Sequence, residues 1–260
     1  MGSLAGKSPA NTYKSLLKVA DETNGVTTTP SVIEDGEGTA TCLDVSANKF
    51  RVTPNSDNTE GFAVKKSAGN NIFTVDTTNN LIKVGTSQVS ATTQLLTFNA
   101  YRIVPASAGT HYLVGLPTGE YVSHNVEIQI GTGTDPDTSK DAGSSTQYFT
   151  NFIFPVPYNI TIDACKALIS SYDDTDIVVN THLMSYDMVA DGTTNDGNLS
   201  NGTVLADGQA TAVDRNVIKT VDCTIQNSSV TSGKVIACTV ENVTNTHYIN
   251  IQVQVKYHIA

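Results

Sequence analysis

Apolar and polar residues alternate along short stretches of this chain, and the stretches lengthen after residue 95. In the last of them the apolar positions are Tyr248, Ile249, Ile251, Val253, Val255 and Tyr257, with Asn250, Gln252, Gln254 and Lys256 between them. A period of two is that of a β-strand with one buried and one solvated face. We therefore predict an all-β protein in which residues 96–260 form an antiparallel β-sandwich or jelly-roll head.

The N-terminal region has the one strong helical pattern. In residues 8–19, Tyr13, Leu16 and Leu17 recur at i, i+3 and i+4, after a capping serine and a proline suited to the first turn. The sequence predicts a short amphipathic helix that ends near Asn24-Gly25. Because so short a helix needs a packing partner, we expect these three apolar side chains to anchor the protein to another component.

Short strands at nearly regular spacing follow. Apolar runs at 61–64, 72–76 and 81–85 are separated by turn-like residues at 68–71 and 77–80. Each run has too few apolar side chains for one chain to bury, but three identical chains wound about an axis could bury them. We therefore divide the chain into an anchoring region (1–58, a helix and β-structure), a trimeric β-shaft with its linker (59–95) and the head.

Composition narrows the possible partners. Charged residues make up 15% of the chain, and the net charge is −10 with a pI near 4.8. Most of the excess acid lies after residue 100, where 16 acidic residues face 7 basic ones. Such a surface does not attract nucleic acid or an anionic membrane, so neither is expected as a partner.

No stretch reaches the roughly 20 apolar residues of a membrane span, and the first residues lack the apolar run of a signal peptide. We expect synthesis in a host cytoplasm without membrane insertion. The four cysteines have no CxxC spacing, which argues against zinc. Cys223 and Cys238 flank a turn-like segment and could form a disulfide across a hairpin, although two buried thiols are the favoured alternative in a reducing cytosol.

Carboxylates cluster at three places, where a glycan-cleaving pair could lie. The clusters are Asp173, Asp174 and Asp176; Asp135, Asp137 and Asp141; and Asp187, Asp191 and Asp196. Each lies among Gly, Thr, Ser and Asn, where Asp is favoured for its bonds to the local backbone, so solvated loops are the preferred interpretation. Residues 191–198 resemble a calcium loop only loosely, because the spacing and the closing Glu are missing.

Histidines and aromatic residues give no site. His111, His124, His182, His247 and His258 have no metal-binding spacing, and no P-loop, dinucleotide or Gly-x-Ser-x-Gly motif occurs. The chain lacks Trp, and for Tyr101, Tyr112, Tyr121, Tyr148 and Tyr158 core or interface roles are favoured over a sugar platform. We predict no catalytic residue, no metal and no cofactor, and we name no receptor-binding residue.

Several segments carry a resemblance to a known class of proteins. Residues 7–19 (KSPANTYKSLLKV) and 34–39 (EDGEGT) are similar to modules that begin tail-fibre and virion structural proteins of tailed bacteriophages, marine ones especially. Residues 71–85 (NIFTVDTTNNLIKVG) resemble the recurring shaft unit of phage fibres. Residues 157–163, 182–187 and 197–202 resemble parts of C-terminal sandwich heads on such proteins.

The resemblance implies a homotrimeric, non-enzymatic fibre or spike, assembled on the virion through its N-terminal region and in contact with a glycan or protein of the host surface. The shaft unit occurs about once instead of in a long array, so the fibre would be stubby. Two alternatives therefore stay open: a capsid decoration or head-fibre protein that stabilises the shell, and a glycan-cleaving spike.

Overall fold

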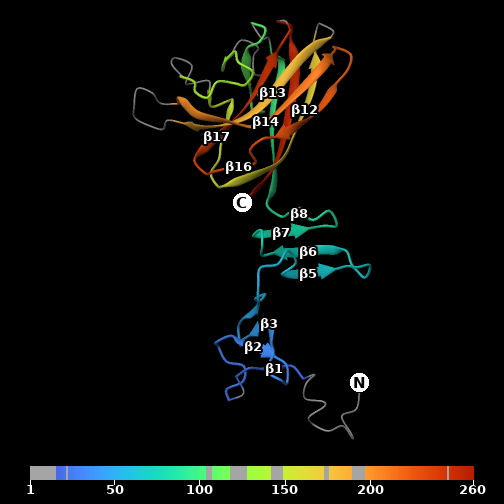
Figure 1. The fold of residues 1–260 in the computed structure, drawn as a ribbon, viewed down its shortest axis with the longest axis vertical. Coiled ribbons are helices and arrows are strands. Elements are labelled where there is room, and N and C mark those ends of the chain that lie inside the picture. The colour runs from blue at the N-terminus through green and yellow to red at the C-terminus, as the bar shows by residue number, and fades with distance from the viewer. Residues whose placement is uncertain are drawn as a thin grey trace. The chain divides into compact units, whose positions relative to one another are not determined.

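The structure is a computed structural model that describes residues 16–21, 23–103, 107–117, 128–141, 149–172, 176–188, 197–244 and 246–260. Every element with bounds inside these ranges is a β-strand, β1 to β18 (Figure 1). The predicted all-β class is therefore confirmed. The chain divides into two compact units, residues 1–91 and 92–260.

The first unit begins with a four-stranded antiparallel sheet in the order β1-β2-β3-β4. Its strands are β1 (Lys18–Val19), β2 (Ser31–Glu34), β3 (Ala40–Val45) and β4 (Phe50–Val52). The β2–β3 turn is held by Asp35, whose Oδ1 accepts the backbone N–H groups of Glu37 (2.9 Å) and Thr39 (2.8 Å). This is the local bonding for which turns favour aspartate.

The predicted N-terminal helix is wrong over the part that the structure describes. Leu16 and Leu17 have no regular structure, and the next two residues form β1, which pairs with the end of β2. The Lys18 amine lies 3.2 Å from the Glu34 carboxylate and adds to this pairing. Strand pairing satisfies the backbone here in place of a helical turn. Tyr13 and the rest of the predicted helix lie outside the described residues.

The second sheet of this unit has the order β5-β6-β7-β8 and is also antiparallel. Its strands are β5 (Phe62–Lys65), β6 (Asn71–Asp76), β7 (Leu81–Val84) and β8 (Val89–Ser90). The Asp76 carboxylate, which has no exposed surface, accepts from the Lys83 amine at 2.6 Å and from Asn79. These hydrogen bonds, of which the one from Lys83 has the largest effect, lower the pKa of Asp76 to about 2.

One face of this second sheet is apolar, whereas the other combines polar side chains with Ala63, Ile72 and Leu81. Cross-strand register places Phe62, Val75 and Ile82 in one row and Val64, Phe73 and Val84 in the next, all on one face because strand residues two apart share a face. We call these six side chains the apolar face. The opposite face has Thr74, Asp76 and Lys83.

The first unit has no apolar core of its own among residues 16–21 and 23–91, because no apolar side chain there is buried. On the apolar face, Phe62, Val64, Ile82 and Val84 keep 41–47% of their surface exposed. The buried side chains are polar instead: Ser46, Thr74 and Asp76.

The second unit is a single antiparallel sheet in the order β10-β17-β13-β14-β15-β12-β18-β9, with β11 beside β17 and β16 beside β12. The strands are β9 (Thr93–Ile103), β10 (His111–Val114), β11 (Ile153–Pro155), β12 (Ile160–Ser171), β13 (Ile177–Met188), β14 (Leu199–Val213), β15 (Lys219–Ile225), β16 (Ser229–Val230), β17 (Lys234–Asn242) and β18 (Ile249–Ile259).

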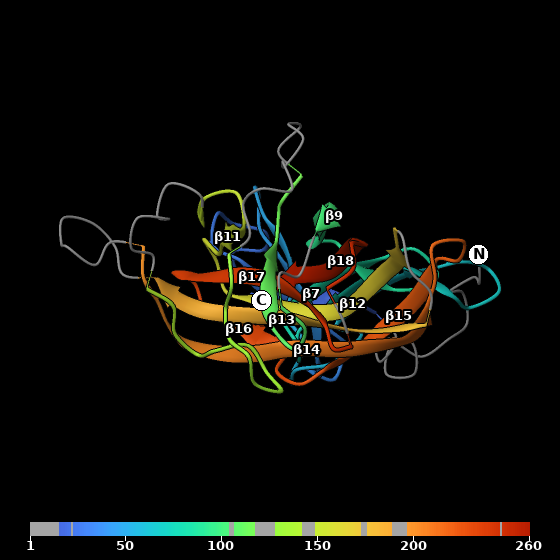
Figure 2. The same ribbon diagram turned by 90° about the horizontal axis from the view of Figure 1, so that it is seen from above.

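This sheet curls until it nearly closes like a barrel, and Figure 2 shows the curvature of β14 and β15. The two ends of the strand order meet where the N–H of Asn99 donates to the carbonyl of Gly115, just after β10, at 2.8 Å. Only two residue pairs join β14 to β15. The antiparallel β-head is therefore present, whereas the predicted jelly roll is not confirmed.

The core lies inside the curled sheet. Alternate residues of β18 are buried, namely Ile249, Ile251, Val253, Val255 and Tyr257, which confirms the period of two. They pack with apolar side chains of the other long strands in one cluster. Residues 163–170 belong to β12, and pairing with β15 and β18 satisfies the backbone of residues 165–169 on both sides.

The cysteines are arranged differently from the predicted hairpin. Cys223 on β15 lies directly opposite Cys165 on β12, whereas Cys238 is on β17, which does not pair with β15. A hydrogen bond between the Cys165 and Cys223 thiols raises the pKa of Cys165 and lowers that of Cys223. Burial raises the pKa of Cys238 to about 12.

We expect mild oxidation with diamide to link Cys165 to Cys223 and leave Cys238 reduced. Directly opposed strand residues have Cα atoms about 4.5–5.5 Å apart, within disulfide reach. Peptide mapping without reductant measures the linkage, and C223S is the matched control that should abolish it. A Cys223–Cys238 peptide in the native protein would contradict the strand order.

Candidate functional site

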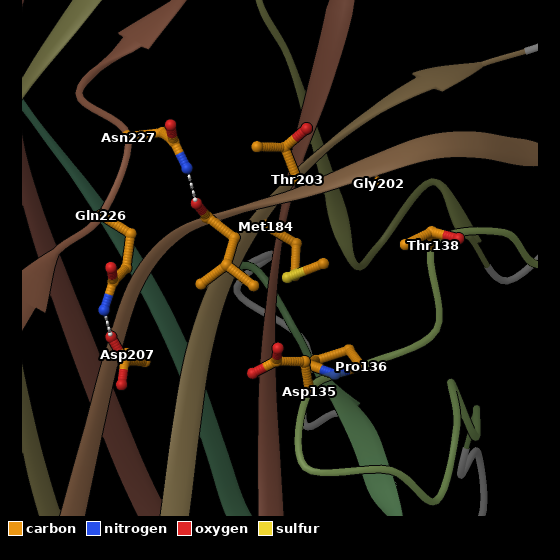
Figure 3. Close-up of a pocket in the computed structure, with 10 residues that line it drawn as sticks. Asp135, Pro136, Thr138, Met184, Gly202, Thr203, Asp207, Gln226 and Asn227 are labelled. Atoms are coloured by element: carbon orange, nitrogen blue, oxygen red, sulfur yellow. Dashed lines mark hydrogen bonds between the residues drawn. The ribbon is translucent and has the colours of Figure 1, made fainter.

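The second unit has a cavity of about 520 Å³ between the loop of residues 131–141 and strands β13 and β14 (Figure 3). Its lining is polar and apolar in about equal parts, and its charged side chains are two aspartates; the lining residues are Asp135, Pro136, Thr138, Met184, Gly202, Thr203, Val204, Asp207, Gln226 and Asn227. A cavity of this volume lies within the usual range for small-molecule sites.

Hydrogen bonds hold the 131–141 loop against the sheet. The Tyr186 hydroxyl donates to the carbonyl of Asp137 (2.9 Å), and the N–H of Gly202 donates to the carbonyl of Thr138 (2.8 Å). Lys140 and Leu199 exchange backbone hydrogen bonds in both directions. The loop wall of the cavity is therefore tied to β13 and β14 at three points.

One glycine makes this close approach possible. A Cβ on Gly202 would lie 2.5 Å from a ring carbon of Tyr186 and 2.8 Å from the Cα of Thr138. Any side chain at this position would push the loop off the sheet. Gly202 thus sets the distance between loop and strand at the cavity.

The opposite wall is formed by β14 and the residues after β15. Asp207 accepts from the side-chain amide of Gln226 at 2.8 Å, and the Asn227 amide donates to the carbonyl of Val204 at 2.8 Å. Both bonds are drawn in Figure 3. Each bond uses one N–H of an amide NH₂ group, so each amide keeps a second N–H donor and its carbonyl oxygen, and Asp207 keeps further acceptor positions on its carboxylate.

A buried histidine pair lies behind this acidic cavity. The His182 ring has its Nε2 3.5 Å from Oδ1 of Asp135 and is directly opposite Asp207 in the β13–β14 register. The His111 ring packs edge-on against it, with centroids 5.0 Å apart. His111 has no exposed surface, and His182 keeps 5%.

Each ring of the pair has one nitrogen in use. Nε2 of His111 donates to the carbonyl of Gly133 (3.0 Å) and lies 3.8 Å from the Glu241 carboxylate. In the described structure, Nδ1 of both rings is buried without a hydrogen-bond partner. Burial has the largest effect on the pKa of His182 and lowers it, and the nearby His111 ring lowers it further. Asp135, Asp207 and Glu241 act in the opposite direction and raise it. The folded head therefore favours a neutral His182.

The predicted carboxylate clusters mostly serve local structure. Asp141 accepts from Asn198 (3.0 Å), and Asp187 accepts from Lys234 (2.6 Å) and Asn201 (2.8 Å). Of the predicted acids that the structure describes, only Asp135 lines the cavity. Asp173, Asp174, Asp191 and Asp196, and with them most of the calcium-like loop, lie outside the described residues.

The described residues include no group of three or more His, Cys, Asp or Glu side chains placed to hold a metal ion. His124 lies outside the described residues. His258 has its Nδ1 2.9 Å from Asp163, away from the cavity lining.

The predicted aromatic and anchoring residues lie apart from the cavity lining. Tyr112 is fully buried, Tyr158 is 62% exposed, and Tyr101 packs edge-on against Tyr172. Tyr121 and Tyr148 lie outside the described residues. Leu16 and Leu17 are 48% and 65% exposed, and their anchoring role stays a prediction.

Most of the cavity residues gave no signal in the sequence. Asp207 lies within β14, Gln226 and Asn227 follow the end of β15, and they are close only because β14 pairs with β15. Gly202 occurs in an ordinary-looking turn sequence. Only a prediction of the strand order would have brought them together.

No protein-family model matches this chain, and no curated protein matches its sequence. Among solved structures, a chain of the empty head of turnip yellow mosaic virus is similar over 64% of this chain and 80% of its own length, at 9% sequence identity and a TM-score of 0.22. At this TM-score the likeness transfers neither fold nor function. No helix of the described residues is long and apolar enough to cross a membrane.

We expect the free energy of unfolding of the head to fall as the pH drops from 7 to 5. His182 has a folded pKa below its unfolded value, so the unfolded chain binds more protons in this range and stability decreases with acid. Urea unfolding at several pH values measures the slope. H182Q should flatten it, H258Q serves as the control, and an unchanged slope in H182Q would contradict the assignment.

Proposed function

We propose that this chain is a non-enzymatic structural protein of a tailed-phage virion, a homotrimeric fibre or spike displayed on the particle that contributes to host-surface attachment. The observation that supports this most is the first unit, whose sheets have apolar faces but no core. A lone chain leaves these faces in water, whereas an assembly of chains covers them.

The apolar face of the β5–β8 sheet is suited to pack against copies of itself. Four of its six side chains keep close to half of their surface exposed. At roughly 1.5–3 kcal/mol for full burial of such a side chain, covering these four contributes about 4 kcal/mol per chain. Its members are uncharged, so identical copies meet without like-charge repulsion.

A second copy is a better occupant than an unrelated protein, because the same arrangement recurs in the first sheet. There Leu43 pairs with Val52 and Val45 with Phe50, on one face of β3 and β4. Phe50 is 64% exposed. We propose three chains in the oligomer because residues 71–85 resemble fibre shaft units. The anchoring role of Tyr13, Leu16 and Leu17 towards other virion proteins belongs to the same proposal.

Two other functions stay in competition. A capsid decoration protein would use the same trimer to clamp shell subunits. A glycan-cleaving spike is favoured by one observation, that Asp135 and Asp207 line the same cavity, as paired carboxylates must in such an enzyme.

We expect V84D to dissociate the oligomer, because it places a charge on the apolar face. I72D is the matched control. Ile72 directly precedes Phe73 on β6 and is 39% exposed, but its side chain points to the face of the sheet opposite the apolar face. Light scattering after size exclusion measures the mass, and circular dichroism checks that the head stays folded. A monomeric wild-type chain, or equal dissociation by both variants, would contradict the proposal.

We expect a gold-tagged antibody against the chain to label intact phage particles on their tail appendages in electron microscopy. Label over the shell would favour the decoration function instead. Particles that stay unlabelled, although the denatured particle proteins react with the same antibody on a blot, would show that the chain is inside the particle. No reaction on the blot would refute the virion role.

A further inference from the structure

We propose that the cavity between the 131–141 loop and strands β13 and β14 binds a neutral carbohydrate through its hydroxyl groups. The inference deepens the proposed attachment function and rests on it for its biological meaning. The binding itself is independent of the oligomeric state, because the cavity is built within the second unit alone.

The cavity presents hydrogen-bond acceptors. The carboxylates of Asp135 and Asp207 line it, and the amide NH₂ groups of Gln226 and Asn227 are engaged by Asp207 and by the Val204 carbonyl. The carbonyl oxygens of the two amides remain available as acceptors. Each amide also keeps one N–H donor, so a ligand that satisfies this wall must both donate and accept hydrogen bonds, as adjacent sugar hydroxyls do.

The charge of the lining selects against acidic sugars. No Lys or Arg is among the described residues that line the cavity, and burial lowers the pKa of the nearby His182, which favours its neutral form. A carboxylate or sulfate on the ligand would meet two aspartates without a compensating cation. Uncharged hexoses and N-acetylhexosamines are therefore the expected class.

About half of the cavity lining is apolar and can cover the C–H side of a pyranose ring. Figure 3 shows the Met184 side chain between Thr203 and Asp135. Pro136 and Val204 add to this apolar part. Because the loop wall is tied to the sheet by the bonds of Tyr186 and Gly202, the acceptors are held in place before the ligand arrives.

A single such site binds weakly. A few hydrogen bonds and one small apolar patch correspond to a dissociation constant on the order of 1 mM. Three linked heads on a trimer would bind a glycan-covered surface far more strongly than one, without any new contact.

The test is saturation-transfer NMR on the full chain with glucose, galactose, mannose, N-acetylglucosamine, glucuronic acid and sialic acid as separate probes. We expect saturable transfer to at least one neutral sugar and none to the two acids. D207N and D135N should each weaken this binding at least about tenfold, because each removes a charge-assisted acceptor. D222N is the matched control, since Asp222 is 81% exposed on β15 and does not line the cavity.

Other results would overturn the inference. They are the absence of saturable transfer to every neutral sugar, equal binding of acidic sugars, or binding that survives in both D207N and D135N. Release of reducing ends from an oligosaccharide, lost in either variant, would indicate hydrolysis in place of recognition. If no neutral sugar binds, but the wild-type chain is a trimer and V84D dissociates, the sugar site is refuted and the proposed structural role stands.

Discussion

A half-buried β-strand needs a cover for its apolar face, and this constraint is met differently in the two units. In the second unit the long strands curl until Asn99 meets Gly115, so their inward side chains cover one another. The β5–β8 sheet of the first unit is too short to curl, and its apolar face stays half-exposed in the single chain. The same periodicity of two therefore produces a head with a buried apolar core and a first unit whose described apolar side chains stay partly exposed.

The curled sheet also creates the candidate site. Because β14 joins β15 by only two residue pairs, a place remains where the 131–141 loop can lie against the sheet, tied down through Tyr186 and Gly202. The acidic cavity lies against these strands, and the buried His111–His182 pair lies next to it, with Nε2 of His182 3.5 Å from Asp135. Burial favours the neutral form of His182, which leaves the two aspartates of the lining without a positive partner.

Sequence reasoning identified some groups of the site and missed others, for physical reasons. Asp135 was noticed as part of an acidic cluster, but its neighbours Asp137 and Asp141 do not line the cavity. Asp207 and Gln226 are 19 residues apart and meet only through pairing of their strands. The wrong helix at Lys18 and Val19 has the same origin, since a two-residue pairing with β2 is stronger than a local helical pattern.

The sequence by itself determined the β class, the alternation of β18 and the shortage of apolar residues in the first strands, because period and composition are local properties of the chain. Only the tertiary structure decided that Cys223 faces Cys165, that Phe62, Phe73 and Val84 share one face, and that two aspartates line one cavity. These facts depend on strand order and register. Both are set by the packing of segments far apart in the chain, where a shift of one residue would exchange the faces.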